Sequence, residues 1–121
     1  MKVLIVDDSK VMRLMVARTL RQAGFEFELI EAENGVKGLE VYQRDSPHLV
    51  LADWNMPEMT GMELLVALRK VDPRVRLGFV TSEQTPAARE AATEAGALFL
   101  IAKPFTPEDF KNRIGPAMHL A

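Results

Sequence analysis

Hydrophobic positions along this chain gather in five short runs, separated by longer segments with a helical period. Four runs are nearly continuous rather than alternating, which is typical of strands buried on both faces of a parallel sheet. The second run mixes glutamate with apolar residues, so we expect it at an edge of the sheet. The runs are Val3–Val6, Phe27–Ala32, Leu49–Ala52, Leu77–Val80 and Leu98–Ala102.

Helix start and stop signals occupy the segments between the runs. Hydroxyl or amide residues stand at the expected N-termini, and Thr60 with Glu63 forms a capping box. Glycine or proline marks the expected C-termini of the first four helices. The expected limits are Ser9 to Gly24, Asn34 to Pro47, Thr60 to Asp72, Thr85 to Gly96, and Thr106 onward.

The fifth helix contains Gly115-Pro116. A proline in a helix interior costs about 3 kcal/mol or more and usually kinks or ends the helix. We therefore expect a break near Arg113–Gly115, with residues 117–121 forming a second turn or a frayed tail. Alternatively, the natural chain continues past Ala121 as a linker to an effector.

Strand and helix alternate five times, at the spacing of a βα unit. Right-handed crossovers then place helices on both faces of an open parallel sheet. The predicted fold class is therefore a doubly wound α/β domain. In such sheets the functional crevice lies outside the carboxyl ends of the strands, so the residues just past those ends carry the chemistry.

Length and composition narrow the classes of function. The 121 residues suit one domain, residues 1–121, and the net charge of −2 with scattered Lys and Arg provides no basic patch for nucleic acid. The absence of cysteine excludes disulfide and thiolate chemistry. The apolar stretches are too short to cross a membrane, and the first run begins too early to leave room for a signal peptide. We expect a soluble, cytoplasmic protein.

Polar side chains follow four of the predicted strands. Asp7 and Asp8 come after the first strand, Asp53 after the third, Thr81 after the fourth and Lys103 after the fifth. Taken singly, each has an ordinary interpretation as a turn residue, a helix cap or a solvated charge. Their convergence on one edge of the sheet favours a functional site.

Three carboxylates this close together need a cation. Each pair repels by about 3 kcal/mol at a separation of about 5 Å and an effective dielectric constant of about 20. Hard oxygen ligands suit Mg²⁺, and His48 and His119 lie outside the cluster, which disfavours zinc. Together with a lysine and a hydroxyl, the metal would let Asp53 attack phosphorus in line, as phosphoryl transfer requires.

These residues resemble the receiver domain of two-component response regulators. The similarity covers the whole chain, in the order Asp7-Asp8, Asp53, Met56-Pro57-x-x-x-Gly61, Thr81 and Lys103-Pro104-Phe105. Among receivers, the Asp53-Trp-Asn-Met-Pro57 segment and the absence of an output domain are most similar to single-domain chemotaxis regulators. The resemblance implies a flavodoxin-like (βα)5 fold with a five-stranded sheet in the order 2-1-3-4-5.

The resemblance also implies residue roles. Asp53 would accept a phosphoryl group from a phosphohistidine on a sensor histidine kinase or a histidine phosphotransfer protein. Such a protein is a signalling switch that catalyses only its own phosphorylation and dephosphorylation. The Lys103–Pro104 peptide would be cis. The implied Mg²⁺ ligands are Asp8, Asp53, the Asn55 carbonyl and, through a water, Asp7; the implied phosphoryl-binding residues are Trp54, Thr81, Ser82 and Lys103.

Two partner surfaces are expected. On the first helix, Val11, Leu14 and Met15 form an apolar arc away from the core stripe, rimmed by Arg13 and Arg18, where a phosphohistidine helix would dock. The resemblance places the downstream target on the face of the fourth helix, fifth strand and fifth helix, which includes Leu100, Pro104 and Phe105. Leu100 stands where chemotaxis regulators carry a switching aromatic, and a leucine cannot give the same rotamer readout.

Four alternatives remain. A haloacid-dehalogenase-type phosphatase also phosphorylates an aspartate, but it needs Asp-x-Asp after its first strand and a nucleophile that comes first in the chain. A flavodoxin-like cofactor binder needs a phosphate loop after that strand. A pseudo-receiver that only binds partners would not need the complete acidic set. A receiver excised from a longer regulator would have the same sequence features.

Overall fold

In the computed structural model of the protein, which describes residues 1–119, five strands alternate with five helices. The strands are β1 Lys2–Val6, β2 Glu28–Ala32, β3 Leu49–Ala52, β4 Leu77–Thr81 and β5 Leu100–Ala102. The helices are α1 Lys10–Gln22, α2 Gly35–Asp45, α3 Gly61–Val71, α4 Pro86–Glu94 and α5 Pro107–Ala117. Strand β5 begins two residues later than expected. None of the helices within residues 1–119 is long and apolar enough to span a membrane.

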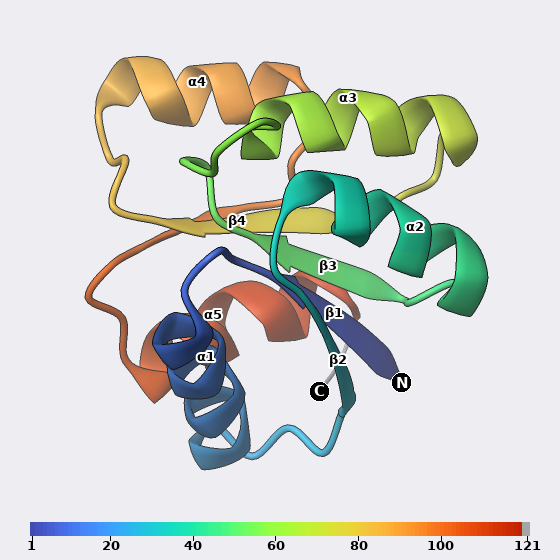
Figure 1. Cartoon of the computed structure of the whole chain (residues 1–121). Coiled ribbons are helices and arrows are strands. Elements are labelled where there is room, and N and C mark those ends of the chain that lie inside the picture. Colours follow the sequence, from blue (N-terminus) through green and yellow to red (C-terminus); the bar gives the residue numbers. More distant parts are fainter. Residues whose placement is uncertain (120–121) are drawn as a thin grey trace.

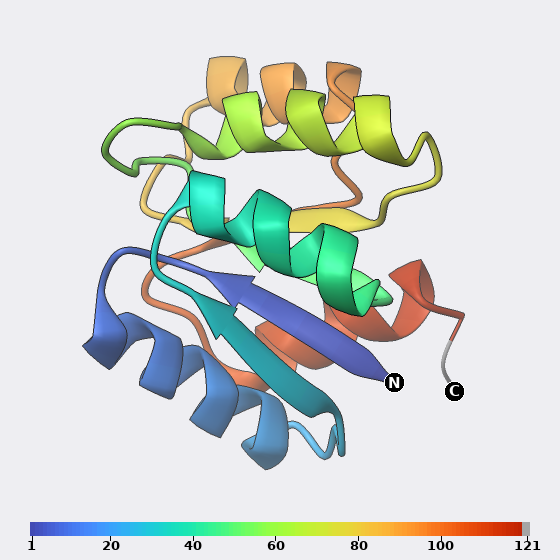
Figure 2. The same ribbon diagram turned by 45° about the vertical axis from the view of Figure 1, so that its right-hand side comes forward.

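All strand pairs are parallel, and their order is β2-β1-β3-β4-β5. The doubly wound fold and the strand order implied by the resemblance are therefore confirmed. Strands β1, β3 and β4, which have the continuous apolar runs, lie inside the sheet. The mixed run of β2 lies at an edge, as its pattern predicted, and Glu28 and Glu31 are exposed there. The parallel arrows and the twist of the sheet are visible in Figures 1 and 2.

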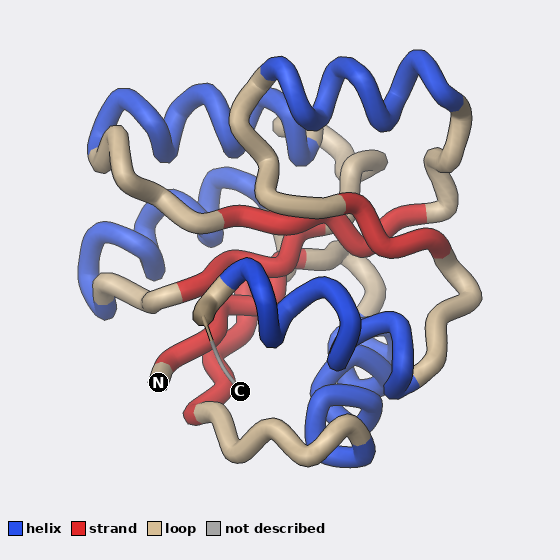
Figure 3. The backbone as a smooth tube through the Cα atoms, turned by 180° about the vertical axis from the view of Figure 1, so that it is seen from behind, coloured by secondary structure: helices blue, strands red, loops and turns tan. Residues whose placement is uncertain are grey.

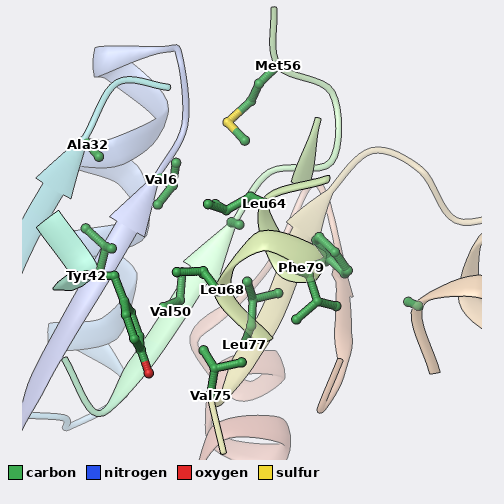
Figure 4. Packing of buried hydrophobic residues seen from close by; sticks show 14 of the residues in the cluster. Val6, Ala32, Tyr42, Val50, Met56, Leu64, Leu68, Val75, Leu77 and Phe79 are labelled. Atoms are coloured by element: carbon green, nitrogen blue, oxygen red, sulfur yellow. The ribbon is translucent and has the colours of Figure 1, made fainter. Parts of the chain in front are cut away.

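The helices cover the sheet from both sides. Helices α2, α3 and α4 lie on one face and α1 and α5 on the other, an arrangement visible from opposite sides in Figures 1 and 3. Alternate residues of the inner strands therefore enter two separate cores. One core contains Phe79 with the leucines of α3 (Figure 4), and the other contains Phe110 of α5. This sandwich fixes the strand ends at which the polar residues lie.

Local capping explains where the helices begin. The Ser9 hydroxyl accepts a hydrogen bond from the Met12 N–H at 3.2 Å, at the start of α1. The expected capping box at α3 is confirmed, with Thr60 and Glu63 each accepting the other's backbone N–H. Each cap satisfies backbone donors that the first helical turn leaves without partners. The loops from β1 and β3 therefore enter their helices in defined directions.

The expected break in the last helix is wrong. Helix α5 continues through Gly115 and Pro116 to Ala117. Pro116 lies in the last turn, so it removes only the hydrogen bond of its own missing N–H, and the Met118 N–H still donates to the Ile114 carbonyl at 3.0 Å. Ile114 and Met118 are buried in the core, which holds this turn in place. The remainder of the expected tail, Leu120 and Ala121, lies outside the described residues.

Candidate functional site

The polar residues after β1 and β3 lie side by side because these strands are in register. Val6 pairs with Ala52, so Asp7 and Asp53 each follow one member of the same pair. Asp7 and Asp53 are buried, with exposed fractions of 4% and 9%, whereas Asp8 is exposed. One carboxylate oxygen from each of the three aspartates lies within 4.8 Å of the others. The expected convergence of the three carboxylates is confirmed.

Lys103, which follows the edge strand β5, extends its side chain to this cluster. Its backbone N–H donates to the Thr81 carbonyl at 2.9 Å, which continues the β4–β5 pairing to the strand end. Its ammonium lies 3.1 Å from Asp7 Oδ2 and 3.6 Å from Asp53 Oδ2. The Lys103–Pro104 peptide is cis, as the resemblance implied. One cation of the protein therefore partly neutralises the two buried carboxylates.

Asp53 occupies an environment that opposes its ionisation. Burial raises the pKa of its carboxyl above the ordinary value, and the nearby Asp7 carboxylate raises this pKa further. The Lys103 ammonium opposes that rise. Asp53 Oδ1 accepts the Trp54 backbone N–H at 2.8 Å, which orients the side chain. A buried carboxylate with a raised pKa is costly to keep charged, and a cation would reduce this cost.

The loop after Asp53 returns closely over the site. Trp54 packs on Phe79 with ring centroids 5.0 Å apart, and its carbonyl accepts the Gly61 N–H at 2.9 Å. A Cβ at position 61 would collide with the Asp53 carbonyl oxygen, so only glycine permits α3 to begin this near the site. The spacing from Asp53 to Gly61 therefore has a steric cause.

Thr81 lies at the inner edge of the site, completely buried at the end of β4. Its hydroxyl oxygen accepts the Glu83 backbone N–H at 3.2 Å. The Glu83 carboxylate in turn accepts the Asn55 amide N–H at 3.2 Å, so these two loop residues meet above the strand ends. Ser82 is exposed between Thr81 and Glu83. The Asn55 carbonyl as a metal ligand, and Trp54 and Ser82 as phosphoryl-binding residues, stay predictions.

Comparison with known proteins identifies this constellation. The family model of the response regulator receiver domain matches residues 3–115. The chain belongs to the response regulator receiver family. The receiver is similar to chemotaxis protein CheY1 of Helicobacter pylori, with 39% identity over 118 residues and 94% of each chain covered. It is similar to chemotaxis protein CheY of Bacillus subtilis, with 38% identity over 118 residues and 98% of each chain covered.

Solved structures agree with this assignment. The receiver superposes on the chemotaxis protein CheY4 of Vibrio cholerae with a TM-score of 0.86 at 32% identity, covering 96% of this chain and 97% of that chain. It superposes on a putative response regulator of Chloroflexus aurantiacus with a TM-score of 0.88 at 28% identity, covering 98% of this chain and 97% of that chain. The fold similarity therefore extends over nearly the whole chain.

The receiver's acidic cluster fits a magnesium ion. It offers three hard oxygen donors on adjacent loops, two of them from buried carboxylates whose mutual repulsion Lys103 only partly offsets. Neither histidine belongs to the cluster. The nitrogen of His48 instead accepts the Lys2 backbone N–H at 3.0 Å, next to the first residue of β1. The residues that would hold the ion are Asp7, Asp8 and Asp53.

The expected docking arc on α1 is accessible. Val11, Leu14 and Met15 are 67%, 55% and 48% exposed, and they line a shallow cavity of about 330 Å³ with Arg18 and Arg21. The expected rim is corrected in one respect. Arg13 does not border this arc, because its guanidinium turns inward to the Asp7 carbonyl at 2.7 Å.

The expected target face needs another correction. Leu100 is only 6% exposed and packs in the core, so it offers a partner little surface beyond its place in the lining of the cavity between α4, β5 and α5. Pro104 is exposed, and Phe105 is half-buried with its ring stacked 4.9 Å from Phe110. Between α4, β5 and α5 lies a cavity of about 300 Å³ whose charged lining residues are Arg89, Asp109 and Arg113.

Proposed function

We propose that this receiver is a phosphorylation-activated signalling switch in which Asp53 carries the phosphoryl group. The observation that supports this most is the position of Lys103, whose ammonium lies within 4 Å of both Asp7 and Asp53. A phosphoryl group on Asp53 would bring its oxygens beside that ammonium. The carboxylates of Asp7, Asp8 and Asp53 would hold Mg²⁺.

The transfer involves one bond exchange at phosphorus. A carboxylate oxygen of Asp53 attacks phosphorus, and the phosphorus–nitrogen bond of a phosphohistidine donor breaks. The imidazole nitrogen leaves with the electron pair and takes a proton from solvent. Bound Mg²⁺ would supply charge neutralisation for the phosphoryl oxygens. Hydrolysis by water then returns the carboxylate and releases inorganic phosphate, which resets the switch.

Thr81 is the proposed link from the site to the rest of the domain. Its buried hydroxyl oxygen accepts the Glu83 backbone N–H, and the same hydroxyl faces the Asp53 carboxyl, whose pKa it lowers. A phosphoryl oxygen on Asp53 would offer this hydroxyl a more strongly charged acceptor, so Thr81 would move toward that oxygen. Its displacement would change the packing under Leu100 and the cavity between α4, β5 and α5. A leucine there responds by repacking rather than by the swing of an aromatic ring.

The partners follow from this chemistry. The donor is a sensor histidine kinase or a histidine phosphotransfer protein, which docks on Val11, Leu14 and Met15 of α1. The target is a protein that binds the face formed by α4, β5 and α5. We place the receiver in a cytoplasmic two-component system of the chemotaxis type, because its relatives named above are chemotaxis proteins.

Incubation with acetyl phosphate and Mg²⁺, followed by intact-mass measurement, tests the proposal. We expect one labile phosphoryl group on the wild-type protein and none on Asp53→Asn. Asp109→Asn, an exposed carboxylate at the start of α5, provides a matched control that should be phosphorylated normally. A wild-type protein that gains no phosphate would instead favour a scaffold that only binds partners.

Mg²⁺ binding can be measured separately from phosphorylation. Trp54 is the only tryptophan and follows Asp53 directly, so its emission should report Mg²⁺ binding. We expect Mg²⁺ to change Trp54 emission in the wild type and Asp8→Asn to abolish most of that change. A titration that Asp8→Asn leaves unchanged would remove Asp8 from the metal shell.

A further inference from the structure

Arg13 connects three parts of the molecule at the edge of the acidic cluster. It lies in the first turn of α1, where its Nη1 donates to the Asp7 carbonyl at 2.7 Å. Its Nε donates to Glu31 Oε1 on the edge strand β2 at 2.8 Å. The Arg13 side chain is only 13% exposed, whereas that of Glu31 is 46% exposed. A guanidinium this buried is held by its partners rather than by solvent.

The contact with Arg13 completes the hydrogen bonding of Asp7. The Asp7 N–H donates to the Ala32 carbonyl at 3.2 Å, and Asp7 Oδ1 accepts the Ser9 N–H at 2.9 Å. Asp7 Oδ2 accepts from Lys103, which leaves the carbonyl as the remaining polar group of this residue. Arg13 donates a hydrogen bond to that carbonyl. Asp7 is therefore fixed through its main chain and its side chain together.

The same contact constrains Asp8. The Asp7 carbonyl and the Asp8 N–H belong to one planar peptide unit. A hydrogen bond to the carbonyl therefore sets the orientation of the plane from which the Asp8 side chain departs. Asp8 is the exposed member of the acidic cluster, so packing does little to hold it. The position of its carboxylate depends on how firmly this peptide is held.

We infer that Arg13 is a positioning residue of the cation site, which holds the Asp7–Asp8 peptide against β2 through its two-pronged contact with the Asp7 carbonyl and Glu31. The inference rests on the proposed function, because it concerns affinity for the Mg²⁺ that the acidic cluster would bind. Loss of a residue that hydrogen-bonds to a metal ligand and orients it typically weakens metal affinity by about tenfold or more.

Charge and positioning predict opposite effects for Arg13. A positive charge near the cluster repels a cation, so removing it would strengthen Mg²⁺ binding if charge alone mattered. Loss of the hydrogen bond would weaken binding if positioning dominates. Lysine keeps the charge but lacks the planar fork that donates in two fixed directions. Arg13→Met and Arg13→Lys therefore separate the two effects.

The test is Mg²⁺ titration followed by calorimetry and Trp54 emission. We expect Arg13→Met to bind Mg²⁺ about tenfold more weakly than the wild type, and Arg13→Lys to bind it about threefold more weakly. Arg76→Met is the control, since Arg76 is an exposed arginine just before β4, at the end of that strand away from the acidic cluster. It removes the same charge and should leave the affinity within about twofold.

Thermal unfolding in a chelator accompanies the titration, because a merely structural residue would lower stability without changing the affinity of the folded protein. Unchanged or tighter binding in Arg13→Met, or unchanged binding in Arg13→Lys, would overturn the role of Arg13 while leaving the proposed function intact. Absence of Mg²⁺ binding in the wild type would overturn the proposed cation site, and the inference with it.

Discussion

The ammonium of Lys103 lies 3.1 Å from the carboxylate of Asp7, although 96 positions separate the two residues in the chain. Their side chains are 17% and 5% exposed, so the ion pair is largely shielded from solvent. The same ammonium is 3.6 Å from Asp53. Lys103 therefore performs, for the metal-free protein, part of the charge neutralisation that Mg²⁺ would perform.

Replacing Lys103 with Met tests this relationship. In a chelator the variant should stay folded but lose about 1 to 3 kcal/mol of unfolding free energy, because Asp7 and Asp53 are left buried without a countercharge. With saturating Mg²⁺ the loss should disappear or reverse. Denaturant unfolding under both conditions measures the effect. Phosphorylation-dependent partner binding should be blocked, because the phosphoryl oxygens lose their lysine partner.

Lys111→Met is the matched control for this experiment. Lys111 is an exposed lysine of α5, a helix that contributes no residue to the acidic cluster. Its removal should change the unfolding free energy by less than about 0.5 kcal/mol in either condition. If Lys103→Met fails to fold even with Mg²⁺, Lys103 is a structural counter-ion and its signalling role is wrong.

The raised pKa of Asp53 predicts a pH dependence of stability. In the unfolded chain this carboxyl titrates near 3.8, and in the fold burial and Asp7 raise its pKa. Between these two values the folded state binds more protons, so stability falls as pH rises through that window. Asp53→Asn carries no such group. Without metal, the variant should therefore be more stable than the wild type at neutral pH, with the difference vanishing below about pH 3.8.

Denaturant unfolding in a chelator at several pH values measures this difference. Added Mg²⁺ should narrow it at neutral pH, since the ion stabilises the charged carboxylate of the wild type. A variant no more stable than the wild type at neutral pH would show that Lys103 already offsets the burial of the charge.

Much of this site could be predicted from sequence because it depends on strand ends. Continuous apolar runs identify the inner strands of a parallel sheet, and the residues after them must meet at one edge. Four polar residues of the site each stand directly after one of these runs, namely Asp7, Asp53, Thr81 and Lys103. Their separations along the chain therefore did not hide their proximity in space.

The features that sequence reasoning missed depend on contacts without a periodic pattern. Arg13 donates to a main-chain carbonyl and to an edge-strand carboxylate, and the helical period alone placed it on the solvent side. Its position four residues after the Ser9 cap, beside the acidic loop, was the available signal. The resemblance places Leu100 on the target surface, whereas the alternation of β5 directs most of this side chain into the core, with only a small part lining the cavity at that face. Pro116 was tolerated because it stands in the last turn.

The loop between β3 and α3 contains a residue whose backbone strain a substitution can remove. Glu58 has a φ of +68°, in the left-handed region, and is exposed. This conformation costs a residue with a Cβ about 1 to 2 kcal/mol, and glycine avoids the cost while losing more backbone entropy on folding. Glu58→Gly should therefore stabilise the protein by about 0.5 to 1 kcal/mol in denaturant unfolding. Glu58→Ala keeps the Cβ and should give no comparable gain.

The exposed apolar arc of α1 predicts a separation between two phosphodonors. Leu14 is 55% exposed at the centre of the surface formed with Val11 and Met15, so an aspartate there should not disturb the core. Leu14→Asp should slow phosphotransfer from the cognate kinase by about tenfold or more, since a charge in an apolar contact is costly to desolvate. Phosphorylation by acetyl phosphate, which needs no docking, should keep its wild-type rate.

Val36→Asp provides the control for this prediction, because Val36 is an exposed apolar residue of α2, with 45% of its surface accessible. It should leave the rates with both donors unchanged. Phosphorylation time courses with each donor, followed by intact mass, measure the two rates. Equal slowing of Leu14→Asp with kinase and with acetyl phosphate would mean that the substitution perturbs the site itself. The arc on α1 would then have no role in docking the donor.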